Sequence, residues 1–162
     1  MAREDRHVLR NRQAKRPAQQ TQAERQQAVD AESEVVALRV LLVEDEAIIR
    51  FSASEMLSSL GHAVAEAENG ARALALLDAG AFDVLFTDIG LPDMPGDKLA
   101  ALAIGKQPNL CVIFASGYGA PRSDLQRAGL GDAVTLEKPY SERTMVEAIA
   151  LARSRAKVSR PE

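Results

Sequence analysis

From Arg39 onward, short apolar runs rich in β-branched residues alternate with longer segments of helical periodicity. This alternation is typical of βα repeats that build a parallel sheet. The apolar runs are Val40 to Val43, Ala63 to Ala67, Val84 to Phe86, Leu110 to Ala115 and Ala133 to Leu136. Several are apolar throughout, as strands covered by helices on both faces require. The sequence therefore predicts an α/β fold with a doubly wound, five-stranded parallel sheet.

Five helices are predicted around these runs. The first is predicted from one apolar stripe and ends at Gly61. The stripe consists of Ile49, Ala53, Met56, Leu57 and Leu60. The others are predicted over Ala71 to Ala79, Asp97 to Lys106, Arg122 to Ala128, and after Ser141, which we interpret as an N-cap. Strands and helices in strict alternation indicate one domain over residues 39–156, with a short C-terminal tail at 157–162.

The first 38 residues have a different composition, with no aromatic residue, no glycine and six glutamines. Such a segment buries too little apolar surface to offset its ordering entropy, so we expect a disordered or loosely helical tail. The beginning of the tail is basic, but the net charge of the chain is -3, which argues against nucleic acid as a partner. No apolar stretch is long enough for a membrane span, and a cytoplasmic protein is expected.

Charged and hydroxyl side chains follow four of the five predicted strands. Glu44 and Asp45 follow the first, Asp88 the third, Ser116 the fourth and Lys138 the fifth. Ligands of open parallel sheets bind beyond the carboxyl ends of the strands. Three carboxylates placed together repel each other unless a cation lies among them, and oxygen ligands alone suit Mg²⁺. A carboxylate beside Mg²⁺ can attack phosphorus, while a lysine and a hydroxyl bind the phosphoryl oxygens.

Three other residues are interpreted as lying outside this chemistry. His62, before the second predicted strand, is expected to be solvated and remote from the site, and Cys111 is expected to be a buried core thiol. Asp93 follows Asp88 by five residues in a Pro-flanked turn, which does not make a convincing acid/base pair for a hydrolase. An enzyme with its own metabolic substrate is therefore not predicted.

Four stretches of the chain resemble the receiver domain of bacterial response regulators. They are RVLLVEDEAIIR, FDVLFTDIGLPDMPGD, VIFASGYG and LEKPY. The resemblance covers about Arg39 to Ala156, and it implies a flavodoxin-like fold with strand order 2-1-3-4-5. It also implies phosphorylation of Asp88 and a Mg²⁺ site. The implied Mg²⁺ ligands are Glu44, mostly through water, Asp45, Asp88 and the carbonyl of Gly90.

The same resemblance assigns roles to the remaining site residues. Ser116 matches the hydroxyl that follows the phosphoryl group, Lys138 matches the phosphate-contacting lysine, and the bond to Pro139 is expected to be cis. At Thr135 this sequence departs from the usual receivers, which carry an aromatic switch residue there. Residues 114–118 are instead similar to the FAT GUY subgroup of single-domain receivers. We hypothesise that the loop of Gly117, Tyr118 and Gly119 replaces the missing switch.

These implications predict a single-domain response regulator that accepts phosphate from a sensor histidine kinase or a histidine phosphotransfer protein. Only residues 154–162 follow the last apolar helical stripe, so output is expected through phosphorylation-dependent protein contacts or as a phosphate sink. The expected contact face combines the fourth helix, fifth strand and fifth helix. Two alternatives stay open, namely a pseudo-receiver interaction module that is never phosphorylated, and a DNA-contacting regulator that uses the basic tail.

Overall fold

The computed structural model describes residues 36–117 and 122–158. Within these residues, one parallel sheet has the strand order β2-β1-β3-β4-β5. The strands are β1 Arg39–Val43, β2 Ala63–Ala67, β3 Val84–Asp88, β4 Cys111–Ser116 and β5 Val134–Glu137. The predicted fold class and strand order are confirmed. Most of the predicted tail, residues 1–35, lies outside the described residues, and so do Tyr118, Gly119 and residues 159–162.

A helix follows each strand. The helices are α2 Ala47–Ser59, α3 Gly70–Ala79, α4 Gly96–Lys106, α5 Arg122–Arg127 and α6 Glu142–Val158. The Oγ of Ser141 accepts a hydrogen bond of 3.3 Å from the backbone N–H of Thr144, as an N-capping side chain does. Helix α6 continues past residue 156 to Val158. No helix in the described part of the chain has both the length and the apolar character needed to cross a membrane.

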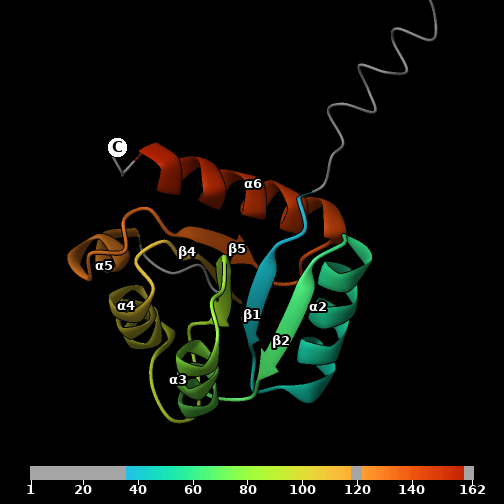
Figure 1. Ribbon diagram of the computed structural model, residues 1–162, viewed down its shortest axis with the longest axis horizontal. Coiled ribbons are helices and arrows are strands. Elements are labelled where there is room, and N and C mark those ends of the chain that lie inside the picture. The colour runs from blue at the N-terminus through green and yellow to red at the C-terminus, as the bar shows by residue number, and fades with distance from the viewer. Residues whose placement is uncertain (1–35, 118–121, 159–162) are drawn as a thin grey trace, which may run out of the picture. The chain divides into compact units, whose positions relative to one another are not determined.

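Helices cover both faces of the sheet (Figure 1). Val40 and Leu42 pack with α2 and α6 in one core, while Leu41 and Val43 pack with α3 and α4 in the other. Successive side chains of a strand point to opposite faces, so a strand between two helix layers must be apolar at every position. Burial on both faces thus explains the continuous apolar runs of the sequence.

Cys111 departs from its expected burial. It is partly buried and packs at the margin of the core that contains α2 and α6. Because it is the first residue of β4, it lies at the amino end of the sheet, where the helices do not cover it fully.

Candidate functional site

The pairing of β1 with β3 brings two acidic residues together. Val43 pairs with Thr87, so the next residues, Glu44 and Asp88, continue side by side at the carboxyl end of the sheet. Glu44, Asp45 and Asp88 each offer one carboxylate oxygen, and these three oxygens lie within 4.8 Å of one another. Glu44 is only 2% exposed, Asp88 is half-buried and Asp45 is exposed.

Strands β4 and β5 bring the hydroxyl and the lysine to the same end of the sheet. Asp88 pairs with Ala115, and Ser116 pairs with Glu137. The backbone N–H of Lys138 donates a hydrogen bond of 2.9 Å to the carbonyl of Ser116, which extends this pairing by one residue. The Lys138–Pro139 peptide bond is cis. Ser116, the last residue of β4, and Lys138, the first residue after β5, therefore lie at the same end of the sheet as Asp88.

Lys138 places its ammonium group between two of the carboxylates. Its Nζ lies 2.7 Å from Glu44 Oε2 and 3.1 Å from Asp88 Oδ2. Burial raises the pKa of Glu44 above its usual value, although Lys138 and the N–H of Glu46 oppose that shift. Burial acts to lower the pKa of Lys138, but the bonds to Glu44 and Asp88 outweigh it and raise this pKa. The lysine therefore stays charged and partly neutralises the acidic cluster.

Comparison with other proteins shows which family the chain belongs to. The response regulator receiver domain family matches residues 40–150. The chain belongs to the response regulator receiver domain family. Such receivers are phosphoacceptor signalling modules of two-component systems and partners of histidine kinases.

Individual relatives are similar over about 70% of this chain or more. The response regulator receiver protein CpdR of Brucella abortus is 36% identical over 115 residues, which are 68% of this chain and 92% of CpdR. The response regulator protein FleR of Pseudomonas aeruginosa is 31% identical, but the match spans 71% of this chain and only 24% of FleR. A crystal structure of a receiver protein from Sinorhizobium medicae has a TM-score of 0.65 at 30% identity, covering 75% of this chain and 99% of that one.

Thr135 is partly buried in β5, where it pairs with Phe114 of β4. The nearest aromatic residue along the chain is Tyr140. Its ring packs edge-on against Phe86, with ring centroids 5.6 Å apart and an interplanar angle of 76°. Burial raises the pKa of Tyr140 to about 12. Sequence reasoning passed over this tyrosine, although it follows Lys138 by only two residues.

Tyr140 also borders an apolar groove beside the acidic cluster, which we call the α2 groove. It has a volume of about 400 Å³ and is lined by Ile48, Ile49, Ser52, Met56, Lys138, Pro139 and Tyr140. On the same helix, Ile48 is 85% exposed and Phe51 is 65% exposed. Lys138 belongs both to this groove and to the carboxylate cluster, so the two features are continuous.

Sequence reasoning also missed Arg50. Its guanidinium donates a hydrogen bond of 2.7 Å to the carbonyl of Glu44 and lies 3.5 Å from the carboxylate of Glu66. A positive group in this position ties helix α2 to the loop that carries Glu44 and Asp45. The partners are a backbone carbonyl and a residue of the next strand, so no spacing of residue types indicated the contact.

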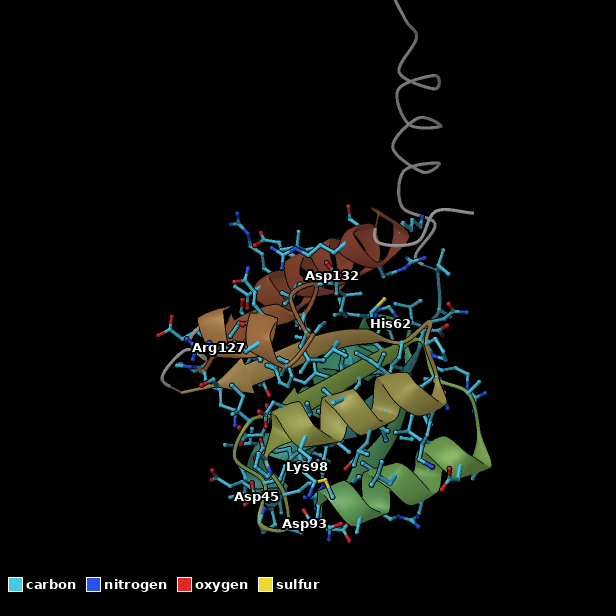
Figure 2. All side chains as sticks on the ribbon, turned by 90° about the vertical axis from the view of Figure 1, so that its left-hand side faces the viewer. Asp45, His62, Asp93, Lys98, Arg127 and Asp132 are labelled. Carbon is cyan, nitrogen blue, oxygen red and sulfur yellow. The ribbon has the colours of Figure 1, made fainter. Side chains whose placement is uncertain are left out.

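The expectation that His62 is solvated needs correction. His62 is remote from the acidic cluster, as predicted, but it is half-buried and its Nδ1 accepts a hydrogen bond from the N–H of Leu38. Burial lowers the pKa of His62, and the charge of Arg153 lowers it further. In Figure 2, Asp93 lies with Asp45 at one end of the sheet, and His62 lies toward the other. Asp93 accepts hydrogen bonds from the backbone N–H groups of Gly70 and Ala71 at the start of helix α3.

Proposed function

We propose that this receiver accepts a phosphoryl group on Asp88 from the phosphohistidine of a sensor histidine kinase or a histidine phosphotransfer protein. The observation that carries the proposal is the convergence of Glu44, Asp45 and Asp88 around the ammonium group of Lys138. The receiver domain would span residues 39–156, between the polar tail of residues 1–38 and the C-terminal residues 157–162.

The residues present fit a Mg²⁺ ion. Glu44, Asp45 and Asp88 offer oxygen donors, which are the ligands that Mg²⁺ prefers. Asp45 and Asp88 would bind it directly, Glu44 mostly through water, and Gly90 through its backbone carbonyl. Bound Mg²⁺ would offset the negative charge of the phosphoryl oxygens.

The protein's own groups account for the transfer itself. A carboxylate oxygen of Asp88 attacks phosphorus and forms the O–P bond while the P–N bond of the donor phosphohistidine breaks. The imidazole nitrogen leaves with the electron pair and takes up a proton from water. Lys138, which already contacts Asp88, would bind one phosphoryl oxygen, and the hydroxyl of Ser116 would bind another.

Output through phosphorylation-dependent protein contacts, or action as a phosphate sink, belongs to the same proposal. The contact face would combine α5, β5 and α6. Because Thr135 replaces the usual switch aromatic, we assign the switch to the loop of Gly117, Tyr118 and Gly119, as the resemblance to the FAT GUY subgroup suggests. Of these three residues only Gly117 is among the described ones.

The α2 groove is the surface we propose for the phosphohistidine-bearing donor. Ile48 and Pro139 are exposed in it, Ile49, Met56 and Tyr140 are partly exposed, and it shares Lys138 with the acidic cluster. A protein that covers Ile48 and Phe51 would remove a large apolar area from water and would place its phosphohistidine close to Asp88.

Phosphotransfer from candidate kinases to wild type and to Asp88→Asn tests this function. We expect labelling of the wild type, no labelling of Asp88→Asn, and normal labelling of Asp97→Asn, a carboxylate of helix α4 outside the cluster. Equal label on wild type and Asp88→Asn would remove Asp88 from its role. A wild type that takes no label from any kinase or small-molecule phosphodonor would instead favour an interaction module that is never phosphorylated.

A further inference from the structure

The loop that follows Asp88, residues 89–95, is closed tightly upon itself. The N–H of Gly96 donates a hydrogen bond of 2.6 Å to the carbonyl of Ile89, and Gly90 forms an antiparallel bridge with Pro95. A Cβ atom at Gly96 would overlap the carbonyl oxygen of Asp88, so only glycine allows the two ends of the loop to meet there.

At its root, the loop contacts the proposed phosphoacceptor. The N–H of Gly90 donates a hydrogen bond of 3.3 Å to Asp88 Oδ1. Lys138 holds the other oxygen, Oδ2. The orientation of the Asp88 carboxylate therefore depends on the position of the loop backbone on one side and on the lysine on the other.

At its tip, the loop is tied to a different element. The two carboxylate oxygens of Asp93 accept hydrogen bonds of 2.9 Å from the N–H of Gly70 and 2.8 Å from the N–H of Ala71, at the start of helix α3. A charged acceptor at a helix N-terminus is favourable, because the first N–H groups of a helix have no partner within it. These bonds hold the pKa of Asp93 below its usual value.

We infer that Asp93 is a positioning residue for the Asp88 site, which it serves by fastening residues 89–95 to helix α3. The inference rests on the proposed function, since it concerns the same carboxylate and the same metal site. Fastening the tip of a closed loop limits the movement of its root, where Gly90 lies beside Asp88. The carbonyl of Gly90 is also a proposed metal ligand, so the fastening should strengthen Mg²⁺ binding.

A purely structural role for Asp93 makes a different prediction, because helix α3 has a second cap. The side chain of Asn69 accepts a hydrogen bond of 2.8 Å from the N–H of Arg72. This bond of Asn69 stabilises the same helix terminus but does not involve the 89–95 loop. Asn69→Ala is accordingly a matched control that removes a helix cap and leaves Asp93 in place.

The test uses the full chain as wild type, Asp93→Ala, Asp93→Asn and Asn69→Ala. Mg²⁺ affinity is measured by titration calorimetry, and labelling by a small-molecule acyl phosphate is followed separately. Asp93→Ala should weaken Mg²⁺ binding about 10-fold, as loss of groups that orient metal ligands typically does. Asp93→Asn keeps one acceptor oxygen, so its Mg²⁺ affinity should lie between those of the wild type and Asp93→Ala. Asn69→Ala should lower the melting temperature but keep the wild-type Mg²⁺ affinity.

The outcomes separate this inference from the proposed function. Equal Mg²⁺ affinity of the Asp93 variants and Asn69→Ala would overturn the positioning role, even if the wild type is labelled normally. A wild type that binds Mg²⁺ but takes no label would overturn the proposed function, and the Mg²⁺ affinities would still decide the role of Asp93. If Asp93→Ala does not fold, the comparison of Asp93→Asn with Asn69→Ala decides it.

Discussion

Lys138 shows how single side chains hold the acidic site together. Its ammonium group contacts both Glu44 and Asp88, and the side chain of Glu44 is 3% exposed. A buried carboxylate that loses its cation keeps its desolvation cost without compensation, which makes the removal of one partner far more damaging than the net value of the pair. The surface pair of Lys106 and Asp78 has no such cost, because both side chains are largely exposed.

We expect Lys138→Met to lower the free energy of unfolding at pH 8 by about 3 kcal/mol without Mg²⁺. The pKa of Glu44, already raised by burial, should rise further when Lys138 no longer opposes the shift. A carboxyl group whose folded pKa exceeds its unfolded pKa destabilises the fold once it is ionised. The loss of unfolding free energy in Lys138→Met, relative to the wild type, should therefore shrink as the pH falls from 8 toward 5. Urea unfolding followed by circular dichroism measures it.

Lys106→Met is the control for this prediction. It removes a lysine whose partner, Asp78, is exposed, so the loss should be below about 1 kcal/mol and nearly independent of pH over the same range. Equal deficits in the two variants, or a Lys138→Met deficit that grows toward pH 5, would contradict the assigned role of Lys138.

At the scale of elements, helix α2 presents apolar residues on two sides. Ala53 and Leu57 are buried in the core, whereas Phe51 and Ile48, which lines the α2 groove, are exposed. An ordinary surface helix has its apolar residues on the core side and polar ones outside. The exposed pair adds nothing to the core, which supports its assignment to contacts with the phosphodonor.

We expect Ile48→Asp and Phe51→Asp to slow phosphotransfer from a cognate kinase about 10-fold or more, because a few buried residues carry most of the binding energy of a protein interface. Labelling by a small-molecule phosphodonor should be unchanged, since such a donor needs no docking surface. Leu102→Asp, at a 43% exposed position on α4 in the other helix layer, is the matched control. The same kinase rates for the α2 variants and for Leu102→Asp would exclude the α2 groove as the docking surface.

At the scale of the whole molecule, the parallel arrangement gathers side chains from four strands at one end of the sheet. The segments that carry Glu44, Asp88, Ser116 and Lys138 are far apart in the sequence. They lie side by side only when the sheet is folded. A ligand that needs several of them binds the native state and not the unfolded chain. Its binding free energy is therefore added to the stability of the fold.

Mg²⁺ should consequently stabilise the fold by about 2.7 kcal/mol at a concentration one hundred times its dissociation constant. Asp45→Asn should abolish most of this gain. It should change the stability little in the absence of the ion, because Asp45 is exposed. Thermal unfolding of both proteins with and without Mg²⁺ measures the effect. An equal Mg²⁺ shift in wild type and Asp45→Asn would show that the ion binds elsewhere.

The order of the elements and the residue types at the strand ends could be read from the sequence alone. Apolar runs and helical stripes are local patterns, so they identified the strands and most helix limits. Because the strands of a parallel sheet end together, this pattern predicts that the carboxylates, Ser116 and Lys138 lie at the carboxyl end of the sheet. The predicted clustering of Glu44, Asp45 and Asp88 follows from this rule.

The groups that these residues bind became known from the folded structure. Arg50 donates to the carbonyl of Glu44, Asp93 accepts from the start of α3, and His62 accepts from Leu38 N–H. In each of these contacts a side chain meets a backbone atom, and every residue carries such atoms, so no spacing of residue types reveals the partner. Lys138 likewise contacts Glu44, 94 positions earlier, because the packed sheet places them together.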